Sequence, residues 1–245
     1  MTELVFTDKG SGPPVVMLHG LGLDRHVFDG VQLPNHRVIR PDLRGHGASP
    51  VPDGPYAMGG LIKDVETMLD TLGIRDAVVF GLSLGGMIAQ GLAVKRLDLV
   101  RGLVLCGTGA KLGQPEPWHA RAKTARESGM SALLQGTLDR LNGGDDPNLI
   151  QRFWNTAPEG YAATCEAIAG TDFYTPTSGL RLPTLGLCGN RDKATPPDLV
   201  RETTDLIPGS TFHLIRGAGH IAPHTHASQV TDQLDTFLNA IGHVS

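Results

Sequence analysis

The sequence has little cysteine, few aromatic residues and little net charge. Of its 245 residues, 3 are cysteine and 5% are aromatic. Cys106, Cys165 and Cys188 are scattered, with no Cys-x-x-Cys pair. This spacing excludes a disulfide framework and a thiol-based metal or redox motif. We expect the cysteines to be small buried residues in a reducing compartment.

Basic patches and long apolar segments are also missing. The formal net charge is −4, so no positive field is present to attract nucleic acid or an anionic membrane surface. No apolar run approaches the roughly 18 residues that span a bilayer. The start, Met1–Leu4, lacks the charged and apolar regions of a signal peptide. The sequence predicts a cytoplasmic protein with neither a nucleic-acid nor a membrane partner.

Short apolar runs alternate with segments of helical periodicity along the chain. Apolar residues repeat at helical spacing over 61–72 and 230–241. Such alternation predicts an α/β fold with a mostly parallel sheet covered on both faces. Leu4–Thr7 is a candidate antiparallel edge strand. The other expected strands are Val15–Leu18, Val38–Pro41, Ala77–Phe80, Gly102–Cys106, Leu185–Cys188 and Phe212–Ile215.

The alternation is interrupted between residues 107 and 183, where no strand-like run occurs. Helices are expected to begin near Pro117, Met130, Pro147 and Pro158, with a break at Gly143–Asp146. We interpret residues 111–179 as an all-helical cap over a core formed by residues 1–110 and 180–245. Aromatic residues in such a cap can line a pocket, although most are expected to pack the cap itself. They are Trp118, Trp154, Tyr161 and Tyr174.

The most informative motif is Gly-Leu-Ser-Leu-Gly at 81–85, which fits the Gly-x-Ser-x-Gly nucleophile elbow. An apolar strand precedes it and the helical stretch Gly86–Ala93 follows. A turn this tight forces Ser83 into a strained backbone conformation and exposes its hydroxyl. At Gly81 and Gly85 a Cβ would collide with the neighbouring strand or helix. Ser83 is the candidate nucleophile.

A serine nucleophile needs a base, and the base needs an acid to hold its tautomer. His220 follows one apolar strand after Gly217 and Gly219, and Asp192 follows another. The resulting order, Ser83, Asp192, His220, is the order of α/β-hydrolase triads. His224 and His226 suggest a metal pattern with His220, but no supporting carboxylate or thiol accompanies them. We therefore expect neither a metal nor a cofactor.

An acyl-transfer site also needs donors for the oxyanion. Leu84 N–H lies at the amino end of the helix after Ser83, where an unpaired amide and the helix dipole favour negative charge. The second donor is expected from the loop after Val15–Leu18, where we choose Leu21 N–H. The sequence thus predicts a cofactor-free serine hydrolase of a small ester or lactone.

Several motifs together resemble the α/β-hydrolase fold superfamily. They are the sequence His-Gly-Leu-Gly at 19–22, the stretch Arg40–Ser49, the elbow, and Gly-Ala-Gly-His at 217–220. The resemblance implies that Asp42, Arg44 and Ser49 brace the loop beside the active site. The amino terminus has room for one strand before Val15 where the superfamily usually has two, which predicts a sheet of about seven strands.

Within that superfamily the chain most resembles 3-oxoadipate enol-lactonases. The likeness rests on Gly107–Gly113, Trp118, Arg121 and the stretch Pro158–Ile168 with Asp172-Phe173. It implies hydrolysis of the enol ester of 3-oxoadipate enol-lactone, a step of bacterial aromatic catabolism. The substrate carries a carboxylate, for which Arg121 is a candidate partner, and Trp118 is a candidate substrate contact beside it. Arg121 is equally explained as a surface arginine whose side chain lies over apolar neighbours. A short-chain carboxylesterase and a ligand receptor on a hydrolase fold are the alternatives.

Overall fold

A central seven-stranded sheet organises the protein, whose computed structural model describes residues 2–141 and 146–244. The strand order is β1-β3-β2-β4-β5-β6-β7. β1 is antiparallel to β3, and the other neighbouring pairs are parallel. The predicted α/β-hydrolase fold and its seven strands are therefore confirmed. The strands are β1 (Phe6–Lys9), β2 (Pro14–Leu18), β3 (Arg37–Pro41), β4 (Ala77–Leu82), β5 (Val100–Cys106), β6 (Thr184–Gly189) and β7 (Thr211–Ile215).

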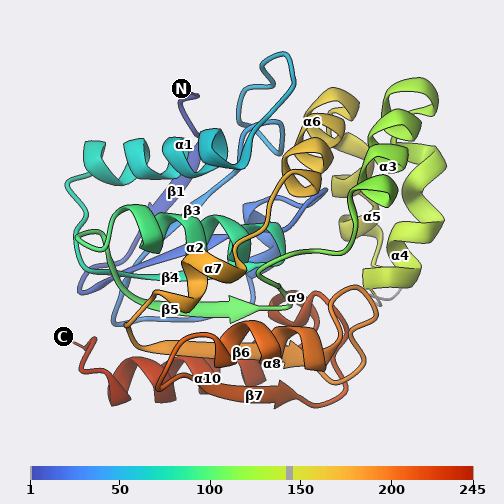
Figure 1. Cartoon of the computed structure of the whole chain (residues 1–245). Helices are drawn as coiled ribbons and strands as arrows, with labels where there is room; N and C mark the ends of the chain where they lie inside the picture. The colour runs from blue at the N-terminus through green and yellow to red at the C-terminus, as the bar shows by residue number, and fades with distance from the viewer. Residues whose placement is uncertain (1, 142–145, 245) are drawn as a thin grey trace.

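Helices cover both faces of this sheet (Figure 1). One face shares an apolar core with α1, α2 and the segments around α7 and α8, and the other with η1, α9 and α10. All residues of β4 are buried, because a central parallel strand is covered on both sides. These elements are η1 (Arg25–Phe28), α1 (Met58–Thr71), α2 (Leu84–Lys95), α7 (Tyr174–Ser178), α8 (Pro197–Asp205), α9 (Ala222–Thr225) and α10 (Ala227–Ala240).

The structure differs from the sequence predictions in two places within the core. The first strand lies at Phe6–Lys9 and not at Leu4–Thr7, because its pairing with β3 begins at Phe6 opposite Pro41. Helix α8 was not expected, since its sequence PDLVRETTD is mostly polar. One side of it is buried, through Val200, Thr203 and Thr204. The three cysteines are free and buried, as expected.

Between β5 and β6 the chain forms a group of helices with an apolar core of their own. Figure 1 shows α3 to α6 together beyond the end of the sheet to which the β5 and β7 arrows point. Their core includes Ala125, Met130, Phe153, Tyr161 and Cys165. The helices are α3 (Pro115–Ser128), η2 (Met130–Leu133), α4 (Leu134–Leu141), α5 (Pro147–Asn155) and α6 (Pro158–Ala169). The division into cap and core at residues 111–179 stays a prediction.

Proline positions set the beginnings of several of these helices. α5 and α6 begin at Pro147 and Pro158, as predicted, because proline suits the first helical turn. α3 begins at Pro115, two residues before the predicted start at Pro117. Of the expected break at Gly143–Asp146, residues 143–145 lie outside the described residues, and Asp146 caps α5 by accepting from Asn148 N–H. Of the helices within the described ranges, none is long and apolar enough to cross a membrane.

Candidate active site

Ser83 lies on a strained turn between β4 and α2. Its backbone has φ 54° and ψ −114°, a conformation that L-residues rarely adopt. A Cβ on Gly81 would lie 2.3 Å from the Gly85 carbonyl oxygen, and one on Gly85 would lie 2.1 Å from the Leu18 carbonyl oxygen. Both glycines are thus required by close backbone approach. The predicted elbow geometry is confirmed.

Hydrogen bonds tie this turn to the neighbouring strand β5. Ser83 N–H donates to the Cys106 carbonyl oxygen at 2.9 Å, and the Thr108 hydroxyl donates to the Ser83 carbonyl oxygen at 2.6 Å. The Ser83 backbone is therefore fixed at the carboxyl end of the sheet. It lines a cavity of about 310 Å³ that His220 also lines.

The side chains of Asp192 and His220 meet behind this cavity, each from the loop after a strand, and His220 lines it. Asp192 follows β6 and His220 follows β7. His220 Nδ1 lies 2.8 Å from Asp192 Oδ2. Because the carboxylate accepts there, we assign the proton to Nδ1, which leaves Nε2 free as the basic nitrogen. The imidazole is only 5% exposed, so this orientation is held by its surroundings.

Several donors hold the Asp192 carboxylate in place. Ala194 N–H and Thr195 N–H donate to Oδ1 at 2.8 and 2.9 Å, and the Thr195 hydroxyl donates to Oδ2 at 2.8 Å. The same hydroxyl lies 3.1 Å from His220 Nδ1. Burial disfavours the charged carboxylate. The interaction with His220 and the hydrogen bonds from Thr195 outweigh burial and lower the pKa of Asp192 below its usual value.

The amide groups of Leu21 and Leu84 are available to an anion. Leu84 begins α2 and Leu21 lies in the loop after β2. Within the described ranges neither N–H has a hydrogen-bond partner. Leu21 and Ser83 line the same cavity. Both amides are therefore free to donate, and their role as the oxyanion donors stays a prediction.

His19 fixes the loop that carries Leu21, a role that sequence reasoning missed. Its Nδ1 lies 2.8 Å from the Gly20 carbonyl oxygen, and Leu43 N–H donates to its Nε2 at 2.9 Å. The ring is fully buried, and burial lowers its pKa, so it stays neutral and accepts from Leu43. Its place directly after β2 is the signal that could have pointed to it.

The remaining wall of the cavity comes mainly from the inserted helices. Trp118 and Arg121, both predicted, line it from α3. The Arg121 guanidinium lies 4.5 Å from the centre of the Trp118 ring. Trp154 instead points outward, with half of its surface exposed. Tyr161 of α6, one of the cap aromatics named from the sequence, also lines it. Lining residues that the sequence analysis missed include Thr137, Arg140 and Leu141 of α4, and Lys193.

The motif residues around 42–49 make structural contacts. Asp42 accepts from Arg25 N–H and Ala48 N–H, both at 2.8 Å. The Ser49 hydroxyl donates to the Asp42 carbonyl oxygen at 2.6 Å. Arg44 forms an ion pair with Asp64 on α1. These bonds fix the loop that supplies Leu43 N–H to His19.

The other two histidines of the possible metal pattern have separate partners. His224 Nε2 lies 2.6 Å from Asp146 Oδ2, and His226 Nδ1 lies 2.9 Å from the Thr225 hydroxyl. In the described part of the chain no three His, Cys, Asp or Glu side chains are grouped so that they could hold a metal ion. The sequence spacing of these histidines therefore does not translate into a shared site.

Comparison with known proteins gives consistent relatives. The alpha/beta hydrolase family model matches residues 15–233. The curated protein 3-oxoadipate enol-lactonase 2 of Acinetobacter baylyi is 35% identical over 193 residues, 76% of this chain and 72% of that protein. The crystal structure of the enol-lactonase from Burkholderia xenovorans LB400 has a TM-score of 0.93 and 35% identity, covering 97% of both chains. A thermophilic esterase from Thermogutta terrifontis has a TM-score of 0.93 and 32% identity, covering 99% of this chain and 95% of that one. The chain belongs to the alpha/beta hydrolase family.

Proposed function

We propose that the chain is a serine hydrolase of small carboxylic esters or lactones, with Ser83, His220 and Asp192 as its triad. The observation that carries this proposal is that Ser83, on its strained turn, and His220, which is hydrogen-bonded to Asp192, line one cavity. A hydroxyl is a poor nucleophile without such a base.

In the acylation step, Ser83 Oγ attacks the ester carbonyl carbon while His220 Nε2 takes the hydroxyl proton. The carbonyl π electrons move to oxygen, and the resulting oxyanion accepts hydrogen bonds from Leu21 N–H and Leu84 N–H. Losing one such donor costs roughly 3 kcal/mol of transition-state stabilisation. Asp192 stabilises the imidazolium that forms, because its charge lies 2.8 Å from Nδ1.

In the second half of the reaction the bond to the leaving oxygen breaks and His220 returns its proton. The leaving enolate of a lactone stays tethered to the acyl group, so no fragment departs at this stage. His220 then takes a proton from water, whose oxygen attacks the acyl carbon. As the bond between the acyl carbon and Ser83 Oγ breaks, His220 returns this proton to Oγ, which regenerates the free enzyme. The chain's residues supply every proton transfer in this sequence.

We propose 3-oxoadipate enol-lactone as the substrate and aromatic catabolism as the role of the enzyme; its cytoplasmic location stays a prediction from the sequence. Support comes from the 35% identity to an enol-lactonase structure that covers nearly the whole chain. The test is ultraviolet-monitored hydrolysis of this lactone beside p-nitrophenyl acetate and butyrate. A kcat/KM for the lactone far above those of the esters is the expected result. Equal or faster ester turnover contradicts this substrate.

The second candidate is a short-chain carboxylesterase with the same triad. The 32% identity to the Thermogutta terrifontis esterase favours it. The same assay separates the two, because an esterase would hydrolyse the simple esters at least as well. A ligand receptor on this fold would instead show negligible multiple turnover of any of them.

A further inference from the structure

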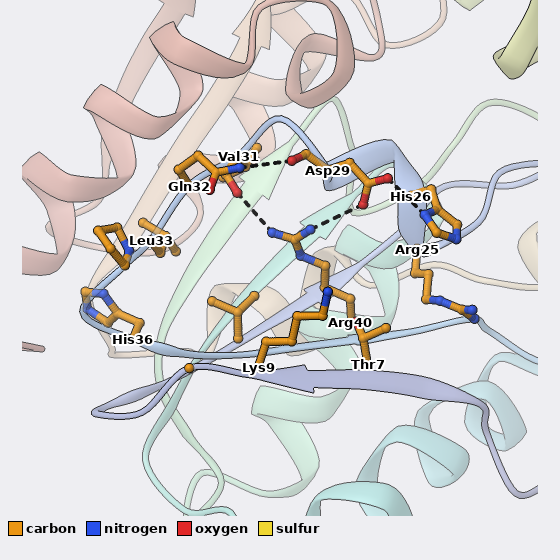
Figure 2. Close-up of a pocket in the computed structure, with 13 residues that line it drawn as sticks. Thr7, Lys9, Arg25, His26, Asp29, Val31, Gln32, Leu33, His36 and Arg40 are labelled. Atoms are coloured by element: carbon orange, nitrogen blue, oxygen red, sulfur yellow. Dashed lines mark hydrogen bonds and ion pairs between the residues drawn. The ribbon is translucent and has the colours of Figure 1, made fainter.

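A second cavity, with a volume of about 530 Å³, lies at the β1 edge of the sheet (Figure 2). Its lining comes mainly from β1, β3 and the segment 25–36 between β2 and β3. None of the described residues that line it also lines the cavity beside Ser83. The proposed reaction therefore gives this cavity no role.

Positive charge exceeds negative charge around this cavity. Of the described residues that line it, Lys9, Arg25 and Arg40 are cationic and only Asp29 is acidic. Arg25 also forms an ion pair with the buried Asp42. Two carboxylates against three cations leave one positive charge unbalanced, in a chain whose formal net charge is −4.

Two of the cations lie on one face of the β1–β3 pair. Thr7 pairs with Arg40 and Lys9 pairs with Val38, and alternate residues of a strand share a face. Lys9 and Arg40 are therefore diagonal neighbours, close enough for their long side chains to interact. Figure 2 shows both side chains on the same side of these strands. Within residues 2–141 and 146–244 Lys9 forms no ion pair, so its charge has no acidic partner there.

The partners of Arg40 balance its charge only in part. Its Nη2 donates to the Val31 carbonyl oxygen at 2.9 Å, and its Nη1 lies 3.5 Å from Asp29 Oδ1. The Asp29 side chain is 60% exposed and also lies 2.9 Å from His26 Nδ1, so solvent and a second partner weaken its effect. The Arg40 side chain is only 17% exposed, and burial lowers its pKa. An anion inside the cavity can stabilise this cation more strongly than Asp29 does.

Unpaired buried nitrogen atoms are concentrated around the same cavity. In the described part of the chain four buried side-chain polar atoms have no hydrogen-bond partner, and three of them belong to its lining: Arg25 Nε, Arg40 Nε and His36 Nδ1. The His36 ring is 6% exposed, and its Nε2 lies 2.9 Å from the His243 carbonyl oxygen. An unpaired buried polar atom costs about 1–3 kcal/mol. A ligand with acceptor oxygens can reduce this cost once the arginine side chains close on it.

We propose that this cavity is a second binding site, for a small organic carboxylate whose charged group contacts Lys9 and Arg40. A carboxylate carries the single negative charge that balances the lining, and a guanidinium can bind it through two parallel hydrogen bonds. A phosphate monoester, with nearly two negative charges, exceeds the unbalanced charge. Val31, Leu33 and Val38 also line the cavity and provide an apolar wall for a short alkyl chain.

The test is a titration of the isotope-labelled protein with butyrate in a low-salt Tris buffer, followed by amide chemical shifts in two-dimensional NMR. The shifts report each cavity separately, so binding of butyrate beside Ser83 is distinguished in the same spectra. We expect the amides of Lys9, Gly10 and Gln32 to shift along one saturable curve. 1-Butanol, which has the same chain length and no charge, should leave them unchanged. Inorganic phosphate that binds here at least as tightly as butyrate contradicts the carboxylate class.

Two variants test the cations. We expect Arg40→Gln to raise the Kd for butyrate at this site by about 10-fold or more, the effect of a charged hydrogen bond to a partly buried group. Lys9→Gln changes an exposed side chain, so it keeps the test decisive if Arg40→Gln does not fold. It should raise the Kd several-fold.

Lys123→Gln is the matched control, since it removes one positive charge from a side chain that is 73% exposed and does not line the cavity. Its Kd should equal that of the wild type. Absence of a saturable shift at Lys9, Gly10 and Gln32 overturns the proposal. So does a Kd that Lys9→Gln leaves unchanged, or one that the control raises equally.

Discussion

The hydroxyl of Thr195 contacts both Asp192 and His220, so it can orient the Asp192 carboxylate. It donates to Asp192 Oδ2 at 2.8 Å and its backbone N–H donates to Oδ1 at 2.9 Å. We expect Thr195→Val to lower kcat by about 10-fold or more with little change in KM, because it removes a hydrogen bond to a buried charge. Steady-state kinetics on the lactone measures this.

Thr195→Ser is the control for that variant, since it keeps the hydroxyl and removes only a methyl group. It should retain most of the wild-type kcat. A wild-type kcat in Thr195→Val would contradict the positioning role, because this variant keeps the methyl group and lacks only the hydroxyl.

Residues that belong to a motif could be predicted from the sequence, whereas residues whose role depends on tertiary contacts could not. Ser83, Asp192 and His220 each follow an apolar strand, and parallel strands bring their carboxyl ends to one edge. Arg140 gives no such signal, because it belongs to an eight-residue helix whose packing against the His220 loop is a tertiary contact. Catalytic roles for the predicted residues stay predictions.

The elbow between β4 and α2 is the element on which the proposed chemistry depends. A Cβ on Gly85 would lie 2.1 Å from a backbone oxygen of β2, which no rotamer change can relieve. We expect Gly85→Ala to lower the free energy of unfolding by more than about 3 kcal/mol. Urea unfolding measures this, with loss of activity in parallel.

Gly59→Ala is the matched control for the elbow variant. A Cβ at Gly59, in α1, meets nothing within 4 Å. Alanine there should leave the free energy of unfolding unchanged or raise it by up to about 1 kcal/mol. An elbow variant as stable as this control would contradict the close-approach argument.

Among elements, buried strands were easier to predict than short amphipathic helices. β4 reads as a continuous apolar run because both of its faces are covered. α8 has a polar sequence and only a narrow buried side, so its helical form depends on packing against β6 and β7. Local propensity alone could not show that packing.

Acid should unfold the whole molecule partly through Glu66. This buried carboxylate of α1 accepts hydrogen bonds from Lys95, Lys63 and Arg96, which together lower its pKa to about 2. Its stabilising contribution is present above the unfolded pKa, near 4.5, and is lost as the pH falls toward 2. We expect Glu66→Gln to be less stable at pH 7 by roughly 1–2 kcal/mol, because its partners are half exposed to solvent.

Thermal or urea unfolding from pH 7 to pH 2 checks this account. The difference between the wild type and Glu66→Gln should shrink as the pH falls below about 4.5. A difference that stays constant over this range would show that Glu66 stabilises the protein by packing and not by charge.

The described residues that line the cavity beside Ser83 include Arg121, Arg140 and Lys193 and no acidic residue, whereas the whole chain has a formal net charge of −4. This positive charge predicts that the hydrolysis of anionic substrates depends on salt concentration. A cationic site attracts an anionic substrate most strongly at low ionic strength. We expect kcat/KM for mono-p-nitrophenyl adipate to fall several-fold between about 0.02 and 0.5 M salt, while that for p-nitrophenyl hexanoate changes little. Parallel salt dependence of the two esters would contradict attraction at the cavity.

The most direct test of the proposed function is the kcat/KM for 3-oxoadipate enol-lactone, measured for the wild type and Ser83→Ala in one assay. Hydrolysis by the wild type and a fall in kcat of about 10⁶-fold in the variant is the predicted result, because the triad acts as a unit. A variant that keeps wild-type activity would show that Ser83 is not the nucleophile.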